Sequence, residues 1–330
     1  MQIRFADPEF ARSFEGYLIY FEDLAGSIGG AYGLAESLAA GVHDAVLARP
    51  AAARASRRPP SGERAAALRE ALHRSWAQLD RAHTEVEDPE WYDVEANAFL
   101  PTMCHYSVLN AISALAVASH QPPPREAISA LSLIGSLAAT AVFPYPWGAT
   151  CSGCPQTGSQ TFTGLGAVPQ SVHVHSAADP SSSVDRYAMF LRTTRAQALE
   201  RCFAEVRRQP PAPGKSRRNV SRTAKEVIAA GTAPTTFFDI LGRTRREALT
   251  DDVDRFVAGA ADDVEARRFA EALVIVTDAT VAAIEAVIAA SVGATLLADV
   301  AEDFFSLNSI SPNSRVGYHA TAWRARSPAR

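Results

Sequence analysis

The feature that most restricts how this chain can fold is an apolar run from Leu273 to Ala298. The run is long enough to cross a membrane, but it contains Asp278 and Glu285. A charged side chain near the centre of a bilayer is costly, so we interpret the run as the middle of a buried core helix. We expect this helix from Glu265 to Phe305. Because it is apolar on most of its circumference, other helices must cover it.

The rest of the chain provides helices that can cover it. Apolar side chains recur at helical spacing on both sides of residues 144–183. Hydrophobic residues make up 47% of the 330-residue chain, which is enough for a substantial core. The sequence therefore predicts an all-α multi-helix bundle. We expect an N-terminal helical region (1–143) and a C-terminal one (184–330), packed as one unit with a loose tail from Ser309 to Arg330.

Residues 144–183 interrupt the helical pattern. Glycine, proline, serine and threonine dominate this segment, and periodic apolar positions are few. An irregular loop of this length is uncommon inside a compact domain unless it has a function or contains short strands. We predict a long irregular loop here, with no sheet beyond a short hairpin.

The same segment contains a possible zinc site. Cys151 and Cys154 form a CxxC pair, and His173 and His175 follow after eighteen intervening residues. Thiolate and imidazole ligands suit tetrahedral Zn²⁺, and a bound metal would explain how the loop stays folded. The two histidines are closer together than in a zinc finger. The alternative is a loop with two unpaired cysteines and two exposed histidines.

Positive charge is concentrated in one stretch. Between Arg186 and Lys225 the chain has eleven basic and two acidic residues, a net charge of +9 in a chain of net charge −4. Such a stretch can bind a phosphate backbone or an acidic partner, so we predict contact with RNA or a nucleotide. The predicted contacts are Arg192, Arg195, Arg217, Arg218 and Arg222. Alternatively, the acidic region Asp251–Glu265 neutralises the stretch within the fold or between the subunits of a homo-oligomer.

Four carboxylates lie seven or fourteen residues apart on one face of the last long helix: Glu271, Asp278, Glu285 and Asp299. Carboxylates aligned in this way bind two metals in some helical bundles, but those bundles add Glu-x-x-His pairs. No histidine lies between His175 and His319. We therefore expect this stripe to be solvated or paired with arginine.

The segment Trp91–Ala139 resembles the core helix pair of HEPN domains, the helical modules of many toxin and antiphage RNases. Its first helix is apolar and contains Cys104-His105-Tyr106, and a polar turn leads to a second helix. The segments Leu191–Arg195 and Thr235–Arg243 are similar to actinobacterial proteins of the same general kind. HEPN RNases have four to six residues between an arginine and the following histidine, a spacing that none of the eight histidines here has. The resemblance therefore implies a fold and a binding or regulatory role more than RNase activity.

Three functions remain open at this point. The first is an HEPN-like protein that contacts RNA or a nucleotide, in defence or regulation. The second is a metal-dependent all-α enzyme that uses the Cys/His loop or the acidic helix, and the third is a non-catalytic interaction scaffold. Met1–Phe10 carries Asp7 and Glu9 before any apolar run, and four cysteines are too few for a disulfide scaffold. We expect a cytoplasmic protein with reduced cysteines and no membrane partner.

Overall fold

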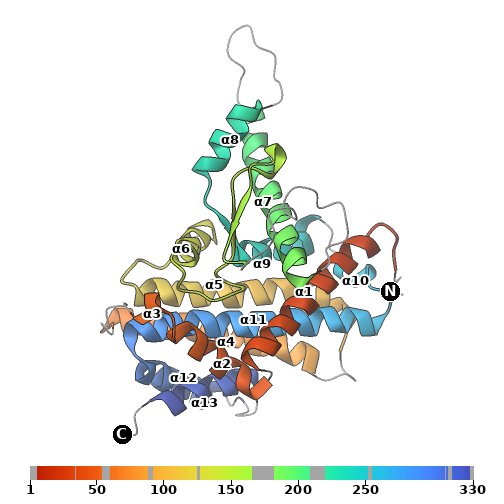
Figure 1. Cartoon of the computed structure of the whole chain (residues 1–330). Helices are drawn as coiled ribbons and strands as arrows, with labels where there is room; N and C mark the ends of the chain where they lie inside the picture. Colours follow the sequence, from red (N-terminus) through yellow and green to blue (C-terminus); the bar gives the residue numbers. More distant parts are fainter. Residues whose placement is uncertain are drawn as a thin grey trace.

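The structure is a computed structural model. It describes residues 6–33, 35–53, 60–87, 92–124, 127–165, 182–208, 220–251, 255–308, 310 and 314–327. This part of the chain is a bundle of α-helices with one small sheet (Figure 1). The predicted all-α fold is confirmed.

The centre of the bundle is α11 (Asp263–Val292). The helix begins after Asp262, whose carboxylate accepts a hydrogen bond from the backbone N–H of Glu265 at 2.8 Å. It ends at Gly293, which has a φ of +96°. Because glycine adopts positive φ without a steric penalty, the chain changes direction there and continues as α12 (Ala294–Asn308). The single helix predicted over this region is therefore two helices.

The helices that pack most extensively against α11 are α1 (Ala11–Tyr32), α2 (Leu38–Leu47), α4 (Glu63–Glu87) and α5 (Leu100–Ala118). In Figure 1, α5 lies above α11, and α2 and α4 lie below it. By length and composition, α5 and α11 could each cross a membrane. In their most apolar windows, however, 67% of the residues of α5 and 94% of those of α11 are buried against the rest of the molecule. Core helices of soluble proteins have the same property.

The C-terminal region holds a helix where we predicted a loose tail. Residues Arg315–Arg326 form α13, which begins after Ser314, whose hydroxyl accepts a hydrogen bond from the Gly317 N–H at 3.1 Å. One face of α13 is buried and includes His319 and Trp323. α13 packs against α12, α2 and α4. The prediction of a loose tail is wrong for this segment, and the helix places His319 inside the core.

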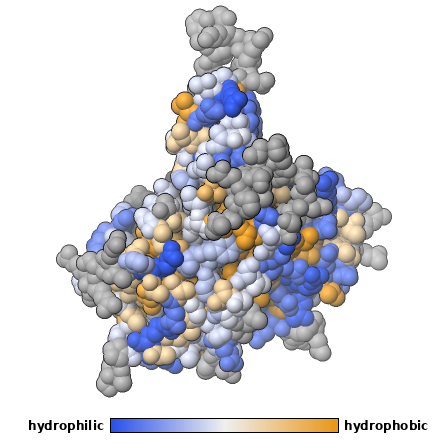
Figure 2. Space-filling view, viewed as in Figure 1, coloured by the Kyte–Doolittle hydropathy of each residue, from blue (hydrophilic) through white to orange (hydrophobic). Residues whose placement is uncertain are grey.

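The remaining helices are α3 (Pro50–Ala53), α6 (Ala127–Ala139), α7 (Ser183–Arg208), α8 (Arg222–Gly231), α9 (Phe237–Arg246) and α10 (Arg255–Ala258). A π-helical turn, Glu247–Asp251, follows α9. In Figure 1, α7 rises from the bundle and carries α8 near its upper end. Hydrophilic residues gather near the top of the described part of this projection in Figure 2.

A small antiparallel sheet lies beside α7. It has the strand order β2-β1-β3, with β1 (Thr150–Ser152), β2 (Thr161–Thr163) and β3 (Thr235–Thr236). The hairpin of β1 and β2 falls in the segment predicted as an irregular loop. The third strand comes from the chain just before α9, so the expectation of a hairpin alone is wrong.

One large hydrophobic cluster includes buried side chains from both predicted regions, from Phe14 in α1 to Trp323 in α13. A second, much smaller cluster lies where α7 meets α8 and the sheet. Its buried members are Cys154, Leu199, Phe203, Val220 and Ala229. The projection therefore has apolar packing of its own in addition to the main core.

Candidate functional site

A cluster of polar side chains lies in the middle of the large core. Its centre is Glu285 of α11, which is fully buried. The indole N–H groups of Trp76 and Trp323 donate to the two carboxylate oxygens at 2.6 and 2.8 Å. The Nδ1 of His319 lies 2.9 and 3.0 Å from the same two oxygens. A buried carboxylate is stable only when it is paired and hydrogen-bonded, and these three side chains meet that requirement.

A second carboxylate extends the cluster on the other side of the His319 ring. The Nε2 of His319 is 2.5 Å from Oδ1 of Asp278, which is two helical turns before Glu285 on α11. The other oxygen of Asp278 accepts a hydrogen bond from the Arg315 guanidinium at 3.0 Å. Two carboxylates, one imidazolium and one guanidinium therefore balance one another inside the core.

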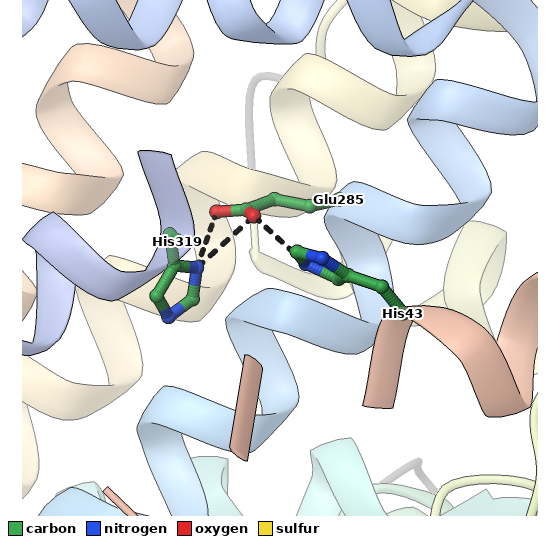
Figure 3. A group of neighbouring side chains, drawn as sticks. All are labelled: His43, Glu285 and His319. Carbon is green, nitrogen blue, oxygen red and sulfur yellow. Dashed lines mark hydrogen bonds and ion pairs between the residues drawn. The ribbon is translucent and has the colours of Figure 1, made fainter. Parts of the chain in front are cut away.

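His43 of α2 completes the group, and Figure 3 shows its ring directed toward Glu285 from the side opposite His319. Its Nε2 is 3.3 Å from Oε2 of Glu285, and its ring stacks on Trp323 at a centroid distance of 3.9 Å. The side chain is fully buried, yet neither ring nitrogen makes a contact with hydrogen-bond geometry. Leaving a buried polar group unsatisfied costs about 1–3 kcal/mol.

The surroundings give the two imidazoles different charge states: His43 is neutral and His319 is protonated. Burial lowers the pKa of His43 to about 4, which keeps the ring neutral. Burial acts in the same direction on His319, but Glu285 and Asp278 outweigh it and raise the pKa of His319 to about 10. Burial also opposes ionisation of the two carboxyls, but the contacts with His319 hold the pKa of both below their usual values.

These positions revise the expectation for the acidic stripe. Glu271 is half exposed and pairs with Arg267 at 2.9 Å, as expected. Asp278 does pair with an arginine, but it does so inside the core. Glu285 is neither solvated nor paired with arginine. One signal was available in the sequence: a carboxylate in the middle of an apolar helix needs a buried partner.

A second candidate site is a pocket of about 350 Å³ between α7 and the end of α9. We call it the arginine pocket, because three guanidinium groups face it. Its lining residues are Gln197, Glu200, Arg201, Ala204, Arg243, Arg246 and Glu247. Arginine clusters of this kind bind phosphate and carboxylate groups.

The acidic group that lies deepest in the pocket is already neutralised. Glu247 is buried and accepts hydrogen bonds from the Tyr17 hydroxyl at 2.6 Å and from Arg243 Nε at 2.9 Å. Arg255 also pairs with it. Although burial opposes ionisation, these contacts lower the pKa of Glu247 below its usual value. Its charge is therefore balanced from within the fold.

The other two arginines repel each other. Burial is the main cause of the lowered pKa of Arg246, and the nearby guanidinium of Arg201 is the next. Arg201 is exposed at the rim of the pocket on α7. An anion bound between the two groups would offset both the loss of solvation and the repulsion.

One of the predicted nucleic-acid contacts has a different role. Arg195 is fully buried, and its guanidinium donates to the carbonyl oxygens of Gly153, Ala229 and Thr232 at 3.1, 2.8 and 3.2 Å, and to that of Ala233. Three of these carbonyls lie at the C-terminal end of α8 or just beyond it, where helix carbonyls lack partners and favour a cation. Arg195 is therefore not at the surface where we expected a nucleic-acid contact, because it is buried and each of its three guanidinium nitrogens already donates inside the fold.

The other predicted contacts are only partly described. Arg192 is half-buried on α7. Arg222 is exposed at the start of α8, where it pairs with Glu226 at 3.3 Å. Arg217 and Arg218 lie outside the described residues. The pocket instead takes Arg201 from the basic stretch and its partners from α9, a helix that the sequence did not connect with binding.

The predicted zinc ligands are only partly described. Cys151 is buried in the large core, and burial raises the pKa of its thiol to about 12. Cys154 is buried in the smaller cluster. His173 and His175 lie outside the described residues. Within the part of the chain that the structure describes, no third metal-binding side chain joins the two cysteines, and zinc binding by this loop stays a prediction.

No family model, curated protein or solved structure matches this chain. The resemblance to HEPN domains therefore stays a prediction. Two sites of the described chain remain as candidates for a function: the buried cluster around Glu285 and the arginine pocket at the surface.

Proposed function

We propose that the protein binds a phosphate-bearing ligand, either a nucleotide or RNA, in the arginine pocket. The observation that supports this function is the convergence of Arg201, Arg243 and Arg246 from two helices on one pocket. The volume of about 350 Å³ is in the range of small-molecule sites. A guanidinium group presents paired N–H donors that match phosphate oxygens and stays charged at any physiological pH.

The three arginines have different tasks in this proposal. Arg243 is held in place by Glu247, by the Thr193 hydroxyl at 2.8 Å and by the Phe190 ring, which lies 4.8 Å from its guanidinium carbon. A donor that is already oriented loses little entropy when a ligand binds. Arg201 and Arg246 face the pocket from α7 and α9 and repel each other, and we expect an anion bound between them to gain most of its affinity from this pair.

The surrounding charge supports the same function. The basic stretch Arg186–Lys225 contains most of α7 and the start of α8, so we expect it to attract an anionic ligand toward the face that carries the pocket. Under this proposal the protein is a cytoplasmic binder of RNA or a nucleotide with a regulatory role. If the basic stretch instead pairs with an acidic region of a second copy, the protein is a homo-oligomeric scaffold and the pocket binds no phosphate.

Fluorescence anisotropy with a labelled single-stranded RNA, at low salt, tests the proposal. Unlabelled ATP and inorganic phosphate are added as competitors, and a direct calorimetric titration with ATP forms a second arm. Binding of RNA that ATP does not displace indicates RNA as the ligand. Binding of ATP without RNA indicates a nucleotide.

The variants Arg201→Gln and Arg246→Gln identify the site. Each removes a charged hydrogen-bond donor, which is worth about 1.5–3 kcal/mol, so we expect affinity to fall about 10- to 100-fold. Arg324→Gln is the matched control, because Arg324 is an exposed arginine on α13 that pairs with Glu302 at 3.1 Å. Wild-type affinity in both pocket variants, or no binding of RNA or ATP by the wild type, would overturn the proposal.

A further inference from the structure

We infer that His43, Glu285 and His319 form a buried site for one transition-metal dication of the zinc class. The three side chains come from α2, α11 and α13 and point toward one another (Figure 3). One ligand atom from each lies within 4.8 Å of the other two. Two imidazoles and a carboxylate form a common ligand set for zinc and related metals. This inference is independent of the arginine pocket.

The present distances are close to those of a tetrahedral site. Bonds of about 2.0–2.1 Å place neighbouring ligand atoms about 3.3–3.4 Å apart. Oε2 of Glu285 lies 3.3 Å from His43 Nε2 and 3.0 Å from His319 Nδ1. The two imidazole nitrogens lie within 4.8 Å of each other, and metal binding at tetrahedral distances would place them about 3.3–3.4 Å apart.

The groups that orient metal ligands are also present. In metal centres, the second nitrogen of a ligating histidine usually contacts a carboxylate, and ligating carboxylates are themselves hydrogen-bonded. Here Asp278 holds the Nε2 of His319 at 2.5 Å, which directs Nδ1 toward Glu285. Trp76 and Trp323 hold the carboxylate through one indole N–H each.

His43 gives the independent observation in favour of a ligand. Its ring is fully buried, and both nitrogens lack a hydrogen-bond partner. Its stacking on Trp323 needs only an aromatic ring, so packing does not explain why the ring carries nitrogens. A metal bound to Nε2 does explain it. An ion-pair network of Asp278, Glu285, His319 and Arg315 would be complete without His43.

Metal binding at this site displaces the proton on Nδ1 of His319 to solvent, and His43 contributes the lone pair of a neutral ring. The ligand side chains are at most 1% exposed, so a substrate has no access to the metal. The metal therefore has a structural role: it joins α2, α11 and α13 and enters as the chain folds.

The test uses the full chain, purified without a histidine tag or chelator. Metal content is measured by inductively coupled plasma mass spectrometry, and protein refolded with Co²⁺ is examined by absorption spectroscopy. His43→Phe removes one ligand and keeps the stacked ring. His105→Phe is the matched control, because His105 is also buried but lies outside the cluster. We expect one equivalent of metal in the wild type and in His105→Phe, and none in His43→Phe. We also expect a chelator to lower the melting temperature of the first two proteins only.

Three results would overturn the inference. One is a wild type that contains no metal and binds no Co²⁺ on refolding. Another is metal retention by a folded His43→Phe variant. The third is a thiolate-to-cobalt charge-transfer band, which would assign the metal to the cysteines. If His43→Phe does not fold, X-ray absorption spectroscopy of the metal-bound wild type identifies the ligand atoms. Imidazole and oxygen ligands support the site, and sulfur ligands contradict it.

Discussion

Replacement of Glu285 by alanine tests how much the buried cluster contributes to stability. The change removes the acceptor for the indole N–H groups of Trp76 and Trp323 and the partner of protonated His319. Loss of one member of a buried ion pair costs about 3–5 kcal/mol, because the remaining charge is left uncompensated. Domains of this kind have a total free energy of unfolding of about 5–15 kcal/mol. We therefore expect a large fall in stability.

Glu271→Ala is the matched control, since Glu271 is another carboxylate of the same helix. Its side chain is 46% exposed and pairs with Arg267 at the surface, an interaction worth at most about 1 kcal/mol. The assay is urea unfolding followed by far-ultraviolet circular dichroism, with a chelator present in all samples so that metal binding does not contribute. The free energy of unfolding of Glu285→Ala should be lower than that of Glu271→Ala by about 2 kcal/mol or more.

If Glu285→Ala does not fold, Glu285→Gln replaces it in the assay. The amide keeps one acceptor oxygen but removes the charge that His319 faces, so we expect a smaller but measurable loss. Equal stability of Glu285→Ala and Glu271→Ala, or of Glu285→Gln and the wild type, would refute the reasoning.

Three further predictions concern stability. Ile284→Asp puts an unpaired charge in the core and should abolish cooperative melting in calorimetry, whereas Val264→Asp, at a 68% exposed position of the same helix, should not. Burial lowers the pKa of His105 from 6.5 to about 4. As the pH falls, the unfolded chain therefore binds a proton at His105 before the folded chain does, and the free energy of unfolding should fall by about 3 kcal/mol from pH 6.5 to 4. Urea titrations across this pH range should show a smaller fall for His105→Gln. Gly153→Ala should lower the melting temperature, because Gly153 has a φ of +73° and an added Cβ would meet a carbonyl oxygen. Gly26→Ala, in open space within α1, should raise stability by about 0.5–1 kcal/mol. A higher melting temperature for Gly153→Ala than for Gly26→Ala would contradict this prediction.

The fold could be predicted from the sequence where the apolar pattern is long and regular. The buried helix α11 follows directly from its continuous apolar circumference. The break at Gly293 could not be predicted, because a glycine within an apolar run does not reveal its φ. The helix α13 was missed because its buried face is short and three arginines make the segment look solvated.

For the candidate sites, less could be predicted from the sequence than for the fold. Glu285 could be identified as a residue that needs a buried partner, but the sequence does not indicate that His43 and His319 meet it from opposite ends of the chain. Charge density indicated the basic stretch, although it did not give the direction of each side chain. Arg195 faces inward because the carbonyls after α8 need a donor, and Arg201 faces the pocket.

The salt dependence of ligand binding by the arginine pocket tests the central claim most directly. Each phosphate contact contributes about −0.7 to −0.9 to the slope of log affinity against log salt concentration. The double variant Arg201→Gln/Arg246→Gln should reduce the wild-type slope for RNA by about one to two units if both side chains contact phosphate, and Arg324→Gln should leave it unchanged. Binding that does not depend on salt, or an equal slope in the wild type and the double variant, would contradict the claim that these arginines bind phosphate.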